Sequence, residues 1–403
     1  MKYFKNTELA KLYNISEKSV RNWIDSSEMG KLDLQLHKEK GKSFVANTSA
    51  NTKIIENLVQ KGKKYKNTRG FKTLQPSEKF YSLYSPKQVI DIISNLDIHR
   101  EIPVQYTYFN SGAKRWDDYT RNLLEADETN ALSNTVNLLD VNIKYLDELL
   151  EGYANVNIID LGVGNALPVR SFLNHFIDKG TLRRYIGIDI SKELLDIAEQ
   201  NIREWFGNKV HFEGHVRDIV YDRFDDLLVS ESFGDKAEST INIVLFLGGT
   251  LSNFRDPEHA LSTIHDSMGK GDLMFFTKKL DTERARRFFE LAAPGNQAID
   301  LVLHFLNVDK SYYNLEPVFD EQKKARELYA RLKVALSIEF ELGGQKRTVE
   351  LNKGEGILLW RARHQNTIEI IEQFSKADLE LIQSTRSKDQ TYILTISKIK
   401  TDR

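Results

Sequence analysis

The order of apolar and polar positions predicts that the larger, carboxyl-terminal part of the chain alternates β-strands with helices. Short apolar runs end in turns, several of which carry glycine, and the first two runs are followed by segments with helical spacing. Strands that alternate with helices indicate βαβ crossovers, and therefore a parallel sheet covered on both faces. We expect a Rossmann-like α/β fold with its ligand at the carboxyl ends of the strands. The expected strands are 156–164, 185–191, 209–216, 241–253 and 272–281, and the expected helices lie around 169–176 and 194–206.

The first 73 residues follow a different pattern, in which two short helices precede a hairpin. The apolar spacing predicts a tight turn between the helices and places the second helix, a candidate recognition helix, over 16–25. Residues 32–48 alternate apolar and polar positions on both sides of a Lys-Gly turn, which predicts a hairpin with a basic tip. This assembly resembles a winged helix-turn-helix. Residues 60–72 have no apolar period, so we place a linker and the domain boundary there. Thr7, Asn14 and Ser16 are expected to cap or turn the two helices.

Composition places the chain among folded, water-soluble proteins. Of its 403 residues, 40% are hydrophobic and 29% are charged. The chain has no cysteine, which excludes disulfides, a thiolate nucleophile and thiolate-bound metal, and we expect no metal site. Its longest apolar runs are far shorter than the roughly 20 residues of a membrane helix, and its first residues lack an apolar signal core. We therefore expect a cytoplasmic protein with no membrane partner.

The formal net charge of −1 conceals two oppositely charged parts. Residues 1–73 hold 16 basic and 7 acidic residues, whereas residues 74–403 hold 41 basic and 51 acidic residues. A basic module ahead of an acidic body is typical of a chain whose amino-terminal end binds a polyanion, so duplex DNA is one expected partner. The alternative is a module that docks another protein or the rest of this chain. The expected DNA contacts are Lys18, Arg21 and Asn22 on the recognition helix, with Lys38, Lys40 and Lys42 on the wing.

A glycine-rich turn and an acidic residue predict a nucleoside-containing cofactor. Gly162 and Gly164 follow the first strand and allow close approach of a ligand, and Asp189 at the end of the second strand can accept both ribose hydroxyls. NAD and S-adenosylmethionine both fit this pattern. A dinucleotide fingerprint needs a third glycine to pack against the pyrophosphate, and this sequence has none in that region. Asp160, just before the turn, also favours S-adenosylmethionine, because it can orient the loop near the amino acid half of that cofactor.

Three segments carry a resemblance to a known family. IIDLGVGNA, YIGIDIS and above all LFLGGTLSNF (245–254) resemble the histidine-specific Nα-methyltransferases of the ergothioneine pathway, which are class I enzymes dependent on S-adenosylmethionine. The likeness extends from about Tyr106 to Lys398 and leaves out the amino-terminal module. It implies a helical amino-terminal part over 74–155, a Rossmann-like core over 156–281, and an α+β substrate domain with closing strands over 282–403.

The resemblance also implies roles for particular residues. Gly162, Gly164 and Asp189 become cofactor contacts. Separately, many methyltransferases have an aspartate at the position of His215 that meets the adenine amino group, and Asp218, three residues later, is the expected replacement acceptor. Asn253 would hold the amino acid end of the substrate, and Tyr106 would form an aromatic wall beside the methyl acceptor; these two are the candidate catalytic residues. The alternative for Asn253 is a cap on the next helix.

Two departures from the family bear on the substrate. A glutamate and a serine grip the imidazole in the family, but Trp360 and Ala362 stand in their places here, and the paired tyrosines are absent from residues 126–136. An apolar pocket would leave imidazole nitrogens unpaired at a cost of roughly 1–3 kcal/mol each. We therefore expect a methyltransferase for a small amino-acid-like acceptor other than histidine, with transfer to nitrogen favoured over oxygen. The alternatives are a transcription regulator whose methyltransferase-like part senses a ligand and, less favoured because the larger part is acidic, an enzyme that methylates nucleic acid.

Overall fold

The structure is a computed structural model of residues 1–403, and it describes residues 3–13, 15–39, 41–68, 70–126, 129–228, 240–283 and 299–400. The chain divides into two compact units, Met1–Lys72 and Thr73–Arg403. Within the described ranges, no helix combines the length and the hydropathy that a membrane span requires.

The first unit has a hydrophobic core of its own between three helices and a small sheet. Leu9 of α1, Val20 and Ile24 of α2, Val45 of β3 and Ile55 of α3 are all buried there. The sheet has the order β1-β3-β2, and β2 and β3 form an antiparallel hairpin. The elements, in chain order, are β1 (Tyr3–Phe4), α1 (Asn6–Leu12), α2 (Glu17–Glu28), β2 (Leu36–Glu39), β3 (Lys42–Ala46) and α3 (Ser49–Thr68).

The start of α2 agrees with the prediction from the sequence, whereas the start of α1 differs from it. Ser16 is the N-cap of α2, and its hydroxyl accepts a hydrogen bond from the backbone N–H of Ser19 at 3.1 Å. The prediction for Thr7 is wrong: α1 begins at Asn6, because the backbone N–H of Lys5 donates to the Glu8 carboxylate at 2.8 Å and starts the helix earlier. The chain divides at Lys72, within the region 60–72 where the boundary was placed, and α3 continues to Thr68, so most of that region is helical. Asn14 and Lys40 lie outside the described residues.

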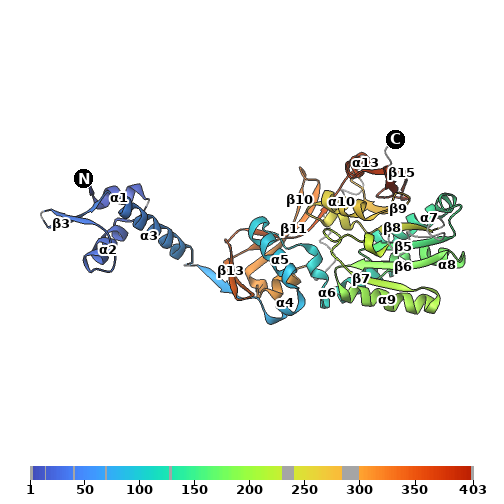
Figure 1. The fold of residues 1–403 in the computed structure, drawn as a ribbon, viewed down its shortest axis with the longest axis horizontal. Helices are drawn as coiled ribbons and strands as arrows, with labels where there is room; N and C mark the ends of the chain where they lie inside the picture. Colours follow the sequence, from blue (N-terminus) through green and yellow to red (C-terminus); the bar gives the residue numbers. More distant parts are fainter. Residues whose placement is uncertain are drawn as a thin grey trace. The chain divides into compact units, whose positions relative to one another are not determined.

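The second unit is built on a seven-stranded sheet with the order β15-β16-β9-β8-β5-β6-β7 (Figure 1). β5, β6, β7, β8 and β9 run parallel, whereas β16, near the end of the chain, is antiparallel to both of its neighbours, β9 and β15. The strands are β5 (Asn155–Leu161), β6 (Leu182–Asp189), β7 (Phe212–Val216), β8 (Thr240–Phe246), β9 (Leu273–Lys279), β15 (Leu379–Arg386) and β16 (Tyr392–Ile399). The predicted Rossmann-like fold is confirmed. The fourth strand ends seven residues earlier than expected, because Gly248 and Gly249 have positive φ and turn the chain out of the sheet.

Helices cover both faces because the strand side chains alternate between two apolar cores. Ile158 of β5 packs with α7 (Ala131–Leu149), α8 (Arg170–Asp178) and α9 (Lys192–Phe206), whereas its neighbour Ile159 packs with α10 (Pro257–Ser267) and α13 (Thr367–Lys376). Both isoleucines are 0% exposed. The sheet is thus buried on both sides, which leaves its strand ends as the place for a ligand.

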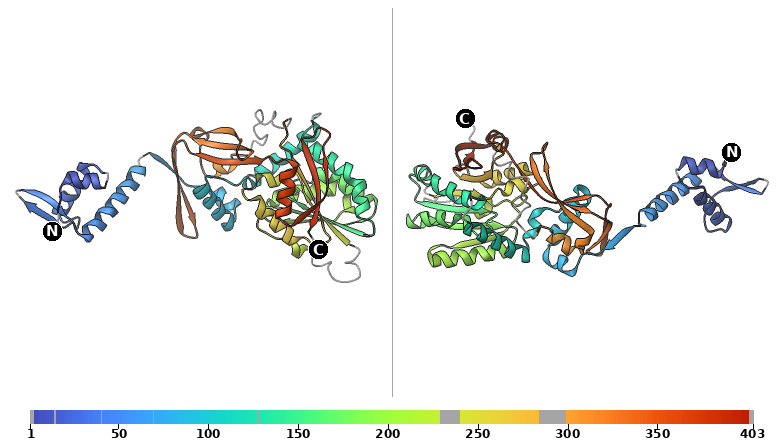
Figure 2. Two further views of the ribbon diagram at one scale, coloured as in Figure 1. Left: turned by 90° about the horizontal axis from the view of Figure 1, so that it is seen from above. Right: turned by 180° about the vertical axis from the view of Figure 1, so that it is seen from behind.

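A smaller α+β body combines the segment between β9 and α13 with β4 and the helices that precede the Rossmann-like part (Figures 1 and 2). It contains two three-stranded sheets, ordered β10-β11-β14 and β13-β12-β4. Its strands are β4 (Phe71–Leu74), β10 (Tyr313–Asp320), β11 (Ala325–Leu332), β12 (Ala335–Leu342), β13 (Gln345–Leu351) and β14 (Gly356–Arg363). Its helices are α4 (Glu78–Leu83), α5 (Pro86–His99), η1 (Val104–Tyr108) and α12 (Leu301–Phe305), and α6 (Ser111–Glu125) leads from them toward the large sheet.

Candidate active site

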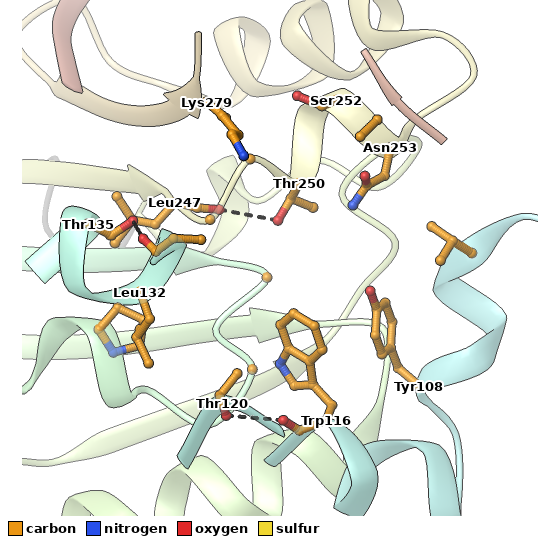
Figure 3. Close-up of a pocket in the computed structure, with 18 of the residues that line it drawn as sticks. Tyr108, Trp116, Thr120, Leu132, Thr135, Leu247, Thr250, Ser252, Asn253 and Lys279 are labelled. Carbon is orange, nitrogen blue, oxygen red and sulfur yellow. Dashed lines mark hydrogen bonds between the residues drawn. The ribbon is translucent and has the colours of Figure 1, made fainter. Parts of the chain in front are cut away.

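A cavity of about 720 Å³ opens at the carboxyl ends of the parallel strands. The loops after β5, β6, β7 and β8 line one side of it, and residues of β9, β11, β14 and the β15–β16 turn line another. Helices α6 and α7 contribute Trp116 and Asn134 to its wall. Figure 3 shows how side chains from these separate elements converge on one space.

The glycine-rich turn after β5 is held in shape by Asp189. The backbone N–H of Gly164 donates to one carboxylate oxygen at 3.1 Å, and that of Ser191 donates to the other at 3.0 Å. Gly162 and Gly164 have φ of 71° and 55°, a left-handed conformation that favours glycine. Burial raises the pKa of Asp189 to about 6, and the backbone donors oppose that shift. A buried carboxyl group with a raised pKa, beside a glycine turn in a cavity, is typical of a ligand site.

Trp116 and Asn165 join this turn to α6, and the sequence analysis missed both. A Cβ on Gly164 would lie 3.2 Å from the Trp116 indole nitrogen, so the absence of a side chain allows the indole to pack on the turn. The Asn165 amide donates to Asp117 at 2.7 Å and to Thr120 at 2.6 Å, both on α6. A single sequence offers no local signal for these contacts, because α6 lies about 45 residues before the turn.

Asp160 lies beneath the same turn as a buried carboxyl group. The Tyr185 hydroxyl donates to it at 2.9 Å. Burial raises the pKa of Asp160 to about 7, the Tyr185 hydrogen bond lowers it, and the nearby Asp189 raises it further. Asp160 therefore changes charge near neutral pH, and a cation bound in the cavity would favour its ionised form.

Asp218 lines the cavity just beyond the end of β7, next to the apolar side chain of Ile219. It accepts a hydrogen bond from the backbone N–H of Val220 at 3.0 Å, and burial raises its pKa to about 6. A carboxyl group beside an apolar side chain suits the amino edge and the face of an adenine ring.

The segment after β8 brings Asn253 to the opposite side of the cavity. Gly248 and Gly249 turn the chain into the short helix η6 (Thr250–Asn253), and the Thr250 hydroxyl donates to the Leu247 carbonyl at 3.2 Å. The Asp256 side chain caps the following helix, α10, so the alternative role of Asn253 as its cap is wrong. The Asn253 amide makes no hydrogen bond within the described residues, and Figure 3 shows it directed toward the cavity.

The structure places Tyr106 elsewhere than the resemblance implies. Tyr106 is 2% exposed, belongs to the core of the α+β body, and its hydroxyl donates to Asp91 at 2.9 Å. Tyr108, two residues later on η1, lines the cavity instead and stacks edge to face with Trp116 at 5.5 Å. Residues two apart on a 3₁₀ helix point in different directions, so the aromatic wall comes from Tyr108. Burial raises the pKa of Tyr108, which keeps its hydroxyl protonated at neutral pH.

Trp360 and Ala362 both line the cavity, but their surroundings are not simply apolar. The Arg326 guanidinium lies over the Trp360 ring, 5.6 Å from its centroid, and Arg326 is the strand partner of Ala362. Lys279, the last residue of β9, and Arg363 of β14 also line the cavity. The expectation of an apolar pocket therefore needs correction, because the indole carries a cation on its face.

The glycine turn after β5, the carboxylate at the end of β6 and the acidic residue beside Ile219 form a site suited to a nucleoside-containing cofactor on a Rossmann-like α/β fold. A model of the family described as histidine-specific, S-adenosylmethionine-dependent methyltransferases matches residues 87–290, about half of the chain. The chain belongs to this family, which confirms the resemblance. It is an S-adenosylmethionine-dependent methyltransferase, and the alternative of a protein that only senses a ligand is not supported.

Three solved methyltransferase structures match the chain at low sequence identity. The S-adenosylmethionine-dependent methyltransferase from Clostridium acetobutylicum is 12% identical, with a TM-score of 0.37, over 72% of this chain and 99% of its own. Magnesium protoporphyrin IX methyltransferase from Synechocystis, solved with bound SAH, is 11% identical, with a TM-score of 0.39, over 73% and 98%. The glycopeptide N-methyltransferase MtfA, complexed with S-adenosylmethionine, is 9% identical, with a TM-score of 0.34, over 65% and 94%. No curated protein matches the sequence significantly.

Proposed function

We propose that this enzyme transfers a methyl group to the amine of a small, amino-acid-like acceptor other than histidine. The observation that carries the proposal is the pair of Asn253 and Tyr108, which face one cavity together with the cofactor turn (Figure 3). Their hydroxyl and amide supply two donor groups and two acceptor groups without a charge, which suits an amino acid head group.

The residues around the turn after β5 fit S-adenosylmethionine, which supplies an electrophilic methyl group on a sulfonium. Asp189 has oxygen lone pairs left for ribose hydroxyls after it accepts from Gly164 and Ser191. Asp218 would accept from the adenine amino group. The pKa of Asp160 is about 7, and the ionised Asp160 carboxylate would stabilise the cationic amino acid end of the cofactor.

The residues around the acceptor would position it and exclude water, and they would contribute less through proton transfer. Tyr108 and Asn253 would hold the acceptor amine in line with the methyl group, and Trp116 closes the wall beneath it. An amine attacks only when neutral, and the cationic side chains of Lys279 and Arg326 in the same cavity disfavour its ammonium form. The site thus favours a reactive amine without a dedicated base.

The titratable groups near Trp360 support nitrogen over oxygen as the acceptor. An oxygen acceptor needs a general base with a pKa near the working pH. Burial lowers the pKa of His364 to about 3, and Ser387 and Thr391 donate to Asp389 at 2.5 and 2.7 Å and lower its pKa. Both groups are therefore weak bases at neutral pH.

Histidine fits the acceptor end poorly. Arginine and lysine side chains donate hydrogen bonds and accept none, so Arg326 and Lys279 cannot satisfy a ring N–H. They would also repel an imidazolium ion. These residues support an acceptor different from the one in the description of the family.

A labelling experiment tests the proposal. The full-length protein is incubated with S-adenosylmethionine that carries a deuterated methyl group and with a small-molecule cell extract, and labelled products are identified by mass spectrometry. We expect one small amine to gain the label, and Asn253→Ala to lower that rate about 10-fold or more, whereas Asn174→Ala on the exposed face of α8 serves as the matched control. Label found only in histidine or in macromolecules would contradict the proposal.

We also propose that the first unit binds duplex DNA. The observation that supports this is the exposure of Lys18, Arg21 and Asn22 along α2, the second helix of the helix-turn-helix pattern, with Lys42 exposed on β3. Lys38 forms an ion pair with Glu28 at 3.0 Å, so it contributes less to phosphate binding than the sequence alone indicates.

Fluorescence anisotropy of the full-length protein with a labelled duplex, over a series of salt concentrations, tests this second proposal. Neutralisation of five to six phosphates predicts a slope of about −5 for log affinity against log salt. Lys18→Ala should reduce that slope by about 1, whereas Asn174→Ala should leave it unchanged. Absence of binding at low salt on any duplex would instead favour a module that docks a protein.

A further inference from the structure

The charges of the cavity are segregated by element. The cofactor side carries three carboxyl groups, Asp160, Asp189 and Asp218, and one cation, Arg217, which pairs with Asp226 at 2.6 Å. The side formed by β9, β11 and β14 carries three cations, and Asp389 is the carboxylate that lines the cavity with them. The three cations are Lys279, Arg326 and Arg363.

The surroundings of these three cations disfavour their charged forms. Burial is the main cause that lowers the pKa of each of them, and Arg326 further lowers the pKa of Lys279. Lys279 and Arg326 are half-buried positive groups that repel each other, and a cluster of such groups in a cavity is typical of a functional site.

The cationic groups lie apart from the residues that hold the reacting amine. Asn253 and Tyr108 come from η6 and η1, whereas Lys279 ends β9 and Arg326 lies on β11. Figure 3 shows Lys279 and Asn253 entering the same space from different elements. A small acceptor can therefore reach both groups at once with two different ends.

We propose that the acceptor carries a second, anionic group, a carboxylate or a phosphate, which Lys279 and Arg326 bind while Asn253 holds the head group. This inference rests on the proposed function and narrows it to amino-acid-like molecules with an acidic side chain. Arg326 stacks on Trp360, which fixes its guanidinium plane for hydrogen bonding with two oxygens of one anion. Lys279 adds a point charge from the end of β9.

Matched probe pairs test the inference by calorimetry on the full-length protein saturated with S-adenosylhomocysteine. Glutamate and glutamine differ only by a charged or neutral side-chain end, and phosphoserine and serine extend the comparison to phosphate. We expect the acidic member of at least one pair to bind about 10-fold or more tightly than its neutral partner. The pair that shows the larger preference distinguishes a carboxylate from a phosphate.

Two variants and a control assign that preference to the cations. Lys279→Met and Arg326→Met should each reduce it to about twofold or less, whereas Lys270→Met, in the exposed turn before β9, should retain it. Equal binding within both pairs, no binding of either acidic probe, or a preference unchanged in both variants would overturn the inference. Failure of the proposed function would look different, because the protein would then methylate no small amine in the labelling experiment.

Discussion

Removal of the Asp189 carboxylate should weaken cofactor binding without unfolding the protein. Asp189 accepts from the backbone of Gly164 at 3.1 Å and of Ser191 at 3.0 Å, and its remaining lone pairs face the cavity. Asp189→Ala therefore removes two charge-assisted hydrogen bonds to ribose and also frees the turn that approaches the cofactor. The expected loss is about 1–3 kcal/mol, which corresponds to about a 5- to 150-fold weaker affinity.

Isothermal titration with S-adenosylhomocysteine measures this loss, and circular dichroism melting checks that the variant is folded. Asp196→Ala is the matched control, because Asp196 is an exposed carboxylate on α9 that pairs with Lys192 at 2.7 Å and does not line the cavity. The control should bind within about twofold of the unmodified protein. If folded Asp189→Ala also bound that tightly, the assignment of Asp189 to the ribose would be refuted.

Two further predictions concern the same turn. The affinity for S-adenosylhomocysteine should fall as the pH falls from 8 to 5.5, by up to about 10-fold per pH unit for each coupled proton. Asp160 (pKa about 7) becomes neutral and no longer attracts the ammonium group, and Asp189 and Asp218 (each about 6) become neutral and accept weaker hydrogen bonds from the ribose and the adenine. The free energy of unfolding without ligand should change in the opposite direction. Since these folded-state pKa values are raised, the folded state binds more protons than the unfolded chain, and the free energy of unfolding falls as the pH rises from about 4 through 7. Titrations measure the affinity and urea melts measure the free energy of unfolding at each pH. If neither quantity changed with pH, both predictions would be contradicted. Gly164→Ala should lower affinity or stability by about 1–2 kcal/mol, because φ of 55° strains an L side chain and its Cβ would meet Trp116 at 3.2 Å; unchanged melting and binding would count against the close packing of this turn.

The sequence predicted the sheet well because its signal is local. Most of the parallel strands contain a run of buried apolar residues, and glycines or an aspartate lie at the ends of several of them, so that Gly162, Gly164, Asp189 and Asn253 all line the cavity. Their positions follow from the rule that ligands bind at the carboxyl ends of parallel strands.

The rest of the site depends on contacts between distant segments. The sequence around Tyr106 and Tyr108 does not show which of the two tyrosines lines the cavity. Their different directions on η1 decide this, and Tyr108 is the one that reaches the cavity. Lys279 and Arg326 are 47 residues apart in the sequence, and they lie on strands of different sheets. No local pattern reports such a cluster, which is why the acceptor pocket was expected to be apolar.

The turnover of free histidine is the most direct test of the claim that this enzyme acts on another small amine. The full-length protein, shown by calorimetry to bind S-adenosylhomocysteine, is mixed with S-adenosylmethionine and histidine, and the products are followed by mass spectrometry. We expect no methylated histidine above the level of a sample without enzyme, because Lys279 and Arg326 cannot accept from the ring nitrogens. Rapid methylation of histidine by the unmodified protein would contradict that claim.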